Sequence, residues 1–244
     1  MKTLIIIPSR LSATRLPGKP LLKINGLSII SHVVKKAESA NIGEVYVATE
    51  DQEIIDDVKQ IGGQAILTSN NHKTGTDRIY EAIEKLGKPD IELVMNLQGD
   101  EPLMNIEDIR NLNNQMIQSK SKLGTLASKI IDKNFYENHN IVKVTTKENL
   151  DISPFPEAIN FMRKQKKISE NIYHHLGIYC YQLKTLKDFV SYKQSKNEIE
   201  NKLEQLRALD NNIKINVALA KSSPIGVDTQ EDFLAIKKIM EYKS

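Results

Sequence analysis

The residues best suited to chemistry lie in a short basic loop near the start of the chain. This loop, Ser9–Pro20, contains Arg10, Arg15 and Lys19 but no acidic residue. Arginine binds phosphate oxygens through two parallel hydrogen bonds, whereas lysine acts as a mobile point charge. Gly18 lets backbone amide groups approach an anion closely. Because three cations roughly match the charge of a triphosphate, the loop predicts a polyphosphate site, with a solvated surface loop as the alternative.

The position of this loop in the chain supports the first interpretation. It follows Leu4–Ile7, a wholly apolar run typical of a strand buried on both faces of a parallel sheet. Ligands of open α/β sheets bind beyond the carboxyl ends of the strands. The loop has neither the Gly-Lys-Ser/Thr of a P-loop nor a Gly-x-Gly-x-x-Gly fingerprint, so a P-loop kinase or a dinucleotide enzyme is not indicated.

Two aspartates, far apart in sequence, are candidate metal ligands. Asp100 follows the apolar run Glu92–Leu97, and Asp228 follows Ile225–Val227. Mg²⁺ prefers oxygen ligands and uses one or two carboxylates together with water and substrate phosphates. The pair therefore predicts a magnesium site if the fold brings both to one edge. A turn former, or a helix N-cap in the case of Asp228, is the alternative.

The elements that must position these residues alternate between strand and helix. Apolar β-branched runs predict strands, and apolar positions at helical spacing predict helices, one of them beginning after an N-cap at Ser28. The first half contains strands at Leu4–Ile7, Val45–Ala48, Ala65–Leu67 and Glu92–Leu97, and helices after Ser28, after Asp51 and at Thr76–Leu86. The second half contains strands at Val142–Thr146, Ile172–Tyr181 and Ile213–Leu219, and helices at Asn197–Leu209 and Gln230–Tyr242.

This order predicts an α/β fold: an open, mostly parallel Rossmann-like sheet with helices on both faces and a smaller inserted lobe. We expect a single domain over residues 1–244, with the lobe at roughly 125–200. A net charge of +3 is too small for wrapping nucleic acid. The lone Cys180 excludes an intramolecular disulfide, and no apolar run is long enough for a membrane helix. We therefore expect a cytoplasmic protein without membrane insertion.

Several motifs, in the same order, resemble one family over nearly the whole chain. They are Ile7–Arg10, Arg15–Leu21, Val47–Thr49, Thr74–Arg78, Asn96–Pro102, His175–Tyr179, Leu203–Arg207 and Val227–Thr229. On these residues the chain is similar to the 3-deoxy-manno-octulosonate (Kdo) cytidylyltransferases. The resemblance implies transfer of CMP from CTP to Kdo, giving CMP-Kdo and pyrophosphate for lipopolysaccharide biosynthesis. It further implies Mg²⁺ as cofactor and a homodimer.

The resemblance also assigns roles to individual residues. It implies that Asp100 and Asp228 hold Mg²⁺, and that Arg10, Arg15, Lys19 and Asp100 are catalytic. The implied nucleotide-binding residues are Ser9, Arg10, Arg15, Lys19, Thr74, Gly75 and Arg78. The implied sugar-binding residues are Arg78, Gln98, His175, Tyr179, Glu204 and Gln205.

The residue types leave structural alternatives open at several of these positions. Thr74 is also a good helix cap. Arg78 lies in the first turn of a predicted helix, where a cation opposes the helix dipole, which favours an anion facing it. The spacing of His175 and Tyr179 places both on one face of a strand, where each is alternatively a half-buried residue with a satisfied polar tip. Glu204 and Gln205 lie in a predicted amphipathic helix, where solvated polar residues are common; His174, next to His175, receives no role.

One departure from the family pattern concerns the sugar. The family usually carries Ser-Arg-x-x-Ile-Pro, whereas this chain has Pro154 after Ser153. Arg163 or a lysine from 164 to 167 is the expected substitute. A related acid such as 8-amino-8-deoxy-Kdo, or a non-catalytic nucleotide sensor, therefore stays open. A glycosyltransferase is less well supported, because residues 99–101 lack the Asp-x-Asp pair.

Overall fold

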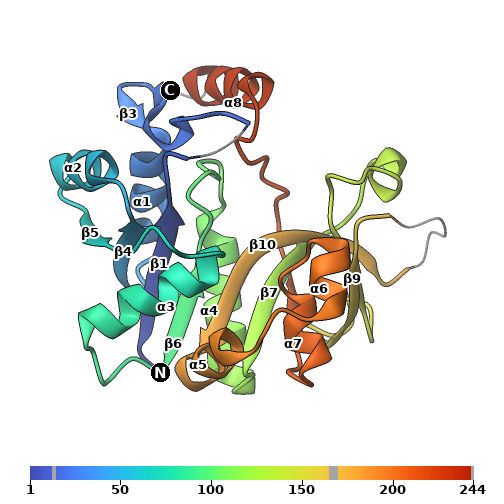
Figure 1. The fold of residues 1–244 in the computed structure, drawn as a ribbon. Coiled ribbons are helices and arrows are strands. Elements are labelled where there is room, and N and C mark those ends of the chain that lie inside the picture. Colours follow the sequence, from blue (N-terminus) through green and yellow to red (C-terminus); the bar gives the residue numbers. More distant parts are fainter. Residues whose placement is uncertain (13–14, 165–169, 243–244) are drawn as a thin grey trace. The chain divides into compact units, whose positions relative to one another are not determined.

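The computed structural model describes residues 1–12, 15–164 and 170–242 and divides into two compact units (Figure 1). Unit 1 comprises Met1, Glu92–Val94 and Glu107–Ser223. Unit 2 comprises Lys2–Ile91, Met95–Ile106 and Pro224–Ser244. The lobe predicted at 125–200 falls within the long segment of unit 1. Among the described residues, no helix combines the length and the apolar character that crossing a membrane requires.

The sheet of unit 2 contains three parallel strands in the order β1 (Thr3–Ser9), β4 (Gly43–Thr49) and β5 (Gln64–Leu67). On the other side of β1 follows β6 (Leu93–Asn96), after which the Leu97 amide donates to the Ile6 carbonyl oxygen at 3.2 Å. The apolar run of β1 is fully buried, as expected for a strand covered on both faces.

Helices cover both faces of this sheet. The chain advances from β1 to β4 to β5 through α1 (Ile29–Ser39) and α2 (Gln52–Gln60), then returns past β1 to β6 through α3 (Gly75–Leu86). Because such crossovers are right-handed, the reversal places α3 on the face opposite to α1 and α2 (Figure 1). The predicted open α/β sheet is thus confirmed. So is the predicted cap, since the Ser28 hydroxyl accepts the Ser31 amide at 3.1 Å.

Smaller elements close unit 2 around the basic loop. The loop leads into a 3-10 helix, η1 (Lys19–Leu21), and a hairpin of β2 (Lys23–Ile24) and β3 (Leu27–Ser28). The C-terminal helix α8 (Gln230–Tyr242) has the predicted bounds and packs on this region. Its buried contacts form a cluster of Ile24, Ile29, Val227, Phe233 and Ile236.

Unit 1 is built on a mixed sheet. The long strand β10 (Ile172–Gln182) pairs antiparallel with β7 (Leu123–Ser128), which pairs parallel with β11 (Asn216–Leu219). An antiparallel ribbon of β8 (Lys143–Thr146) and β9 (Ala158–Met162) extends from β10. The remaining elements are α4 (Ile106–Ser119), η2 (Lys133–Tyr136), α5 (Leu183–Ser191), α6 (Lys196–Asn201) and α7 (Leu206–Asp210).

The predicted single helix at Asn197–Leu209 is wrong, because the chain breaks it into α6 and α7. Lys202 ends α6 in the left-handed conformation at φ +54°. A buried bidentate ion pair stabilises the break: Arg207 Nε and Nη2 donate to the Glu198 carboxylate at 2.8 and 2.5 Å. Glu204 and Gln205 therefore lie in the connection before α7 and not inside a helix.

Candidate active site

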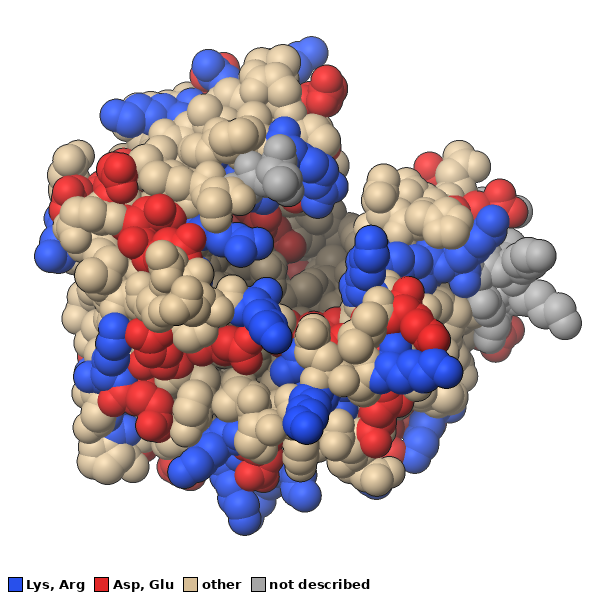
Figure 2. Space-filling model, in the orientation of Figure 1, with Lys and Arg blue, Asp and Glu red and all other residues tan. Residues whose placement is uncertain are grey.

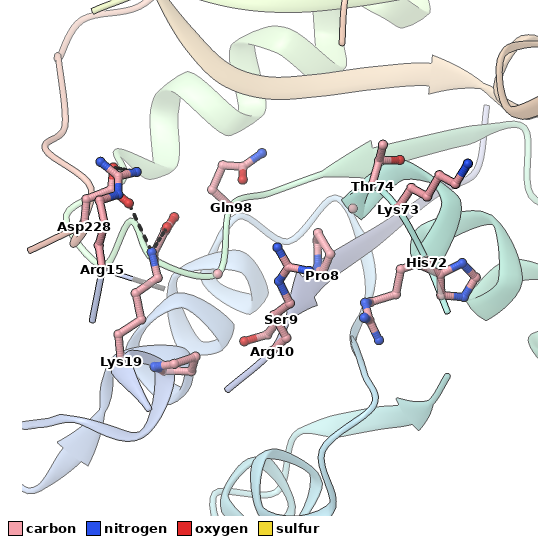
Figure 3. Close-up of a pocket in the computed structure, with 15 residues that line it drawn as sticks. Pro8, Ser9, Arg10, Arg15, Lys19, His72, Lys73, Thr74, Gln98 and Asp228 are labelled. Atoms are coloured by element: carbon pink, nitrogen blue, oxygen red, sulfur yellow. Dashed lines mark hydrogen bonds and ion pairs between the residues drawn. The ribbon is translucent and has the colours of Figure 1, made fainter. Parts of the chain in front are cut away.

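A polar cleft of about 320 Å³ lies in unit 2, beyond the carboxyl ends of β1 and β6 (Figure 3). It contains every residue predicted to bind the nucleotide, together with Gln98 and both candidate metal ligands. The described residues that line it are Pro8, Ser9, Arg10, Arg15, Lys19, Pro20, His72, Lys73, Thr74, Gly75, Arg78, Gln98, Gly99, Asp100 and Asp228. Four segments that are distant in sequence thus meet at one edge of the sheet.

One lysine ammonium group joins the two aspartates. Lys19 Nζ donates to Asp100 Oδ2 at 2.5 Å, to the Val227 carbonyl oxygen at 2.8 Å and to Asp228 Oδ1 at 3.3 Å (Figure 3). Arg15 Nη2 lies 3.0 Å from Asp228 Oδ2. Only 14% of the Lys19 side chain is exposed, so the charge is largely shielded from bulk water. Two carboxylates and two cations of the basic loop therefore neutralise one another.

The basic loop is folded back by backbone contacts. The Gly18 amide donates to the Leu11 carbonyl oxygen at 3.0 Å, and the Leu11 amide donates to Asp51 Oδ2 at 2.7 Å. Gly18 adopts φ +72°, a left-handed conformation that favours glycine, immediately before Lys19 starts η1. This turn directs the Lys19 side chain toward the aspartates.

The two aspartates come together through the backbone that carries them. The Val227 amide donates to the Asp100 carbonyl oxygen at 2.9 Å, which places Asp228 beside Asp100. Capping of α8 does not use Asp228: the Asp232 amide donates to Thr229 Oγ1 at 3.2 Å, and Asp232 Oδ2 accepts from the amides of Asp228 and Thr229. The condition for a shared site, that the fold brings both aspartates to one edge, is met, and the N-cap alternative for Asp228 is not supported.

Gly99 allows the Asp100 segment to approach β1 closely. A Cβ atom at this position would lie 3.0 Å from the Pro8 carbonyl oxygen and 3.4 Å from Ser9 Cβ. We expect Gly99→Ala to push the segment away from β1 and to raise the KM for CTP about tenfold. Steady-state kinetics checks this, and the thermal unfolding midpoint of the same variant shows whether it folds as the wild type does. Unchanged kinetics in Gly99→Ala would show that the close approach is not needed.

A third carboxyl group next to Asp100 is neutral rather than charged. Glu101 Oε2 is buried and has no hydrogen-bond partner among the described residues. Burial, followed by the negative charges of Asp100 and Asp228, raises the pKa of Glu101 to about 8, against the opposing effect of Lys19. At neutral pH Glu101 therefore adds no negative charge to this cluster.

These residues fit a magnesium ion. The carboxylates of Asp100 and Asp228 already converge on one cation, the Lys19 ammonium group. No cluster of three or more His, Cys, Asp or Glu side chains suited to a metal occurs in the described parts of the chain. A site with two carboxylates suits Mg²⁺, which completes its shell with water and phosphate oxygens.

Arg78 lines the cleft but has an anionic partner of its own. Its guanidinium pairs with the Glu50 carboxylate and donates to Thr68 Oγ1 at 2.6 Å, and the residue is only 3% exposed. Arg78 lies in the first turn of α3, where an anion was expected to face its positive charge. That anion is the Glu50 carboxylate. Contact of Arg78 with nucleotide or sugar stays a prediction. Thr74 does cap α3, since its hydroxyl accepts the Asp77 amide at 3.2 Å.

The other sugar-binding candidates belong to unit 1. The rings of His175 and Tyr179 lie 5.5 Å apart on β10, which confirms that they are neighbours. Their pairing with β7 shifts register between residues 176 and 179. Burial, then the charges of Tyr181 and Glu204, raise the pKa of Tyr179, so its hydroxyl stays protonated. Gln205 is buried next to Glu204 at the start of α7.

His175 is neutral and its tautomer follows from its partner. Burial lowers the pKa of His175 to about 3. Its Nε2 lies 3.1 Å from Thr125 Oγ1, whose single proton is donated to a carbonyl oxygen, best placed at Ile178 at 2.7 Å. Thr125 Oγ1 can then accept a hydrogen bond from His175 only if His175 Nε2 carries the ring proton. This tautomer leaves Nδ1 of His175 as a hydrogen-bond acceptor. The satisfied polar tip foreseen as the alternative is therefore present, and a sugar contact stays a prediction.

Arg163 and the lysines between 164 and 167 were the expected substitutes for the missing family arginine. Arg163 donates to the carbonyl oxygens of Asn201, His139 and Lys202 at 3.1, 3.2 and 3.0 Å. Its guanidinium thus holds the surrounding backbone. Residues 165–167, which include two of the candidate lysines, lie outside the described residues.

His72 and Lys73 also line the cleft, although the sequence interpretation assigned them no role. The sequence could have indicated that they line the site, because this basic pair directly precedes the Thr74–Gly75 motif. Elsewhere on the face shown in Figure 2, acidic and basic side chains are interspersed and no field of one sign forms. On this face the concentration of cations is therefore local to the cleft, in keeping with the small net charge.

Comparisons with known proteins place this geometry in context. A family model described as cytidylyltransferase matches residues 4–215. The chain is 42% identical to the 3-deoxy-manno-octulosonate cytidylyltransferase of Thermodesulfovibrio yellowstonii, and the match covers 98% of each chain. It is 37% identical to the protein of that name from Haemophilus influenzae, with 98% of this chain and 99% of the other covered.

Solved structures with similar folds include two nucleotide complexes. A structure of CMP:2-keto-3-deoxy-manno-octonic acid synthetase complexed with CTP matches with a TM-score of 0.90 and 32% identity, covering 100% of both chains. UDP-glucose pyrophosphorylase complexed with UDP-glucose matches with a TM-score of 0.73 over 100% of both chains, but at 14% identity. The second likeness concerns the fold alone.

Proposed function

Because this chain belongs to the cytidylyltransferase family, we propose that it transfers CMP from CTP to Kdo and releases pyrophosphate. The observation that carries the proposal is the cleft of unit 2, where all residues predicted to bind the nucleotide meet. In the reaction, the anomeric hydroxyl oxygen of Kdo bonds to the α-phosphorus of CTP. The bond from that phosphorus to the bridging oxygen breaks, pyrophosphate leaves, and the proton of the hydroxyl passes to solvent.

The chain's own residues supply binding and charge stabilisation. Arg10, Arg15 and Lys19 bind the phosphate oxygens and compensate the charge that develops on the departing pyrophosphate. Asp100 and Asp228 hold Mg²⁺, which when bound supplies further electrostatic stabilisation of the phosphates. Most of the rate acceleration therefore comes from positioning and charge.

The similarity favours Kdo over the two alternatives left open by Pro154. The relatives named for Kdo are similar over almost their whole length, which argues against a different acid and against a sensor without turnover. We extend the proposal to lipopolysaccharide biosynthesis as the destination of CMP-Kdo and to the cytoplasm as the site of action, since the reaction consumes CTP.

A homodimer also belongs to the proposal. Among the described residues of unit 1, the most exposed large apolar side chains are Ile131 at 95% and Ile152 at 85%, which a second copy would shield. Analytical ultracentrifugation decides the point, since a single species of monomer mass at micromolar concentration would exclude the dimer.

The decisive experiment is a pyrophosphate-release assay with CTP and Mg²⁺. We expect release with Kdo and much slower release with 8-amino-8-deoxy-Kdo. Release with neither acid, in a protein that binds CTP by calorimetry, would identify a nucleotide sensor and overturn the proposed activity. Faster release with the amino sugar would reassign the substrate.

The sugar candidates of unit 1 are testable separately from the nucleotide site. We expect His175→Leu to raise the KM for Kdo at least about tenfold, the effect of one lost hydrogen bond to a substrate hydroxyl, and to change the KM for CTP less than about twofold. His174→Leu is the matched control, because His174 contacts Ser223 instead. Equal KM values for Kdo in both variants would exclude His175 from the sugar site.

A further inference from the structure

A segment preceding α3 forms one wall of the cleft and is held by a residue that has no assigned role. The segment Ser69–Lys73 follows β5 and contributes His72 and Lys73 to the lining. Figure 3 shows these two side chains and Thr74 at the end of the cleft opposite to Lys19 and Asp228. If the phosphates of CTP bind at the Lys19 end, the nucleoside faces the segment.

Glu81 of α3 is the residue that holds the segment. Its carboxylate accepts the Ser69 amide at 3.1 and 3.0 Å, and Lys85 Nζ lies 2.7 Å from its Oε1. Its Oε2 also bonds to His72 Nε2. One carboxylate thus fixes the backbone at the start of the segment and the imidazole ring in the wall of the cleft.

The electrostatics keep this carboxylate ionised. Burial by itself would raise the pKa of Glu81, but hydrogen bonds from Lys85, His72 and Ser69 outweigh it and lower the pKa to about 2. A charged acceptor makes stronger hydrogen bonds than a neutral one. Glu81 therefore holds its partners throughout the neutral pH range.

The neighbours of Glu81 on α3 reinforce the attachment. Arg78, Glu81 and Lys85 are spaced three and four residues apart, which places them on one face of the helix. Arg78 Nη1 donates to the Ser69 carbonyl oxygen at 3.3 Å, and Lys85 Nζ donates to the Leu67 carbonyl oxygen at 2.8 Å. Glu81 is the member of this row that reaches His72.

We propose that Glu81 is a positioning residue for the nucleoside part of CTP, acting through His72 and the backbone of Ser69–Lys73. The inference rests on the proposed function, because it assumes that the cleft binds CTP. Glu81 does not itself line the cleft. Its effect is to keep the cleft wall in one arrangement before the nucleotide arrives, so that binding does not have to order it.

The test replaces the charge and keeps the shape. We expect Glu81→Gln to raise the dissociation constants of CTP and CMP by about the same factor, roughly tenfold, as for one lost charge-assisted hydrogen bond. Pyrophosphate inhibition should change less than about twofold, and kcat at saturating CTP less than about threefold. Calorimetry and steady-state kinetics give these values. Glu84→Gln is the matched control, since Glu84 lies on the same helix, is exposed and contacts Tyr80.

Other outcomes would overturn the inference. Unchanged CMP binding would show that Glu81 does not position the wall, and equal weakening of CMP and pyrophosphate would indicate general loosening. If Glu81→Gln does not fold, His72→Ala carries the test, because it leaves the bonds between Glu81 and Ser69 in place. Where both variants fold, the double variant Glu81→Gln/His72→Ala is also measured. Because the two residues act together, it should bind CMP more tightly than the sum of the two single effects on binding free energy predicts. Wild-type protein that fails to bind CTP would instead refute the proposed function.

Discussion

Replacing Lys19 with methionine is expected to weaken CTP binding and, at the same time, to strengthen metal binding by the nucleotide-free protein. In the wild type, the Lys19 ammonium group occupies the place between Asp100 and Asp228 where a metal ion would act. Without it, the two carboxylates repel each other, and among the described residues Arg15 is the ion-pair partner that remains for Asp228. Unit charges 4 Å apart interact by roughly 4 kcal/mol near a protein surface, so even a fraction of this repulsion is measurable.

Weaker CTP binding and stronger metal binding are changes of opposite sign. A loss of folding would weaken both, so the two measurements together distinguish the expected result from unfolding. We expect the KM for CTP in Lys19→Met to rise by about 10², while the dissociation constant of Mn²⁺, measured by titration without nucleotide, falls at least about tenfold. The matched control is Lys23→Met, which removes an exposed lysine four residues away. Unchanged Mn²⁺ affinity would mean that Lys19 does not neutralise the aspartates in solution.

Asp100→Asn is expected to lower kcat by at least about 10², the usual scale for removing a group that stabilises transition-state charge. The change is nearly isosteric. The backbone pairing that joins the two aspartate segments uses the Asp100 carbonyl oxygen, so it survives the substitution. The measurement is pyrophosphate release at saturating CTP, Kdo and Mg²⁺.

The matched control for Asp100→Asn is Asp90→Asn, which alters an exposed aspartate paired with Lys2. Turnover in that variant should stay within about twofold of the wild type. A near-normal kcat together with an unchanged KM for CTP in Asp100→Asn would remove Asp100 from the metal site and from the reaction. A normal kcat with a raised KM for CTP would assign it to binding alone.

Failures of the sequence interpretation arose where long-range contacts override local periodicity. Leu203 and Leu206 continue the apolar spacing of α6, so the pattern predicted one helix where Lys202 and the Arg207–Glu198 ion pair enforce two. The helices α4 and α5 and the strands β7 and β9 received no prediction. In unit 1 the strands pair mainly antiparallel, and the regular alternation of strand and helix that marks unit 2 is lost.

The local features could be predicted from the residues alone: a buried first strand, the cap at Ser28, the bounds of α8, and a loop with three cations and no acid. Each depends on residues within a few positions of one another, where spacing and side-chain chemistry suffice. Which charged side chains meet could be seen only in the folded chain. Lys19 lies 81 positions from Asp100 and 209 from Asp228, and their contact follows from strand order and from the pairing of Val227 with Asp100. The same long-range packing gave Arg78 its partner Glu50 and kept Glu101 neutral, because burial and neighbouring charge are properties of the assembled fold.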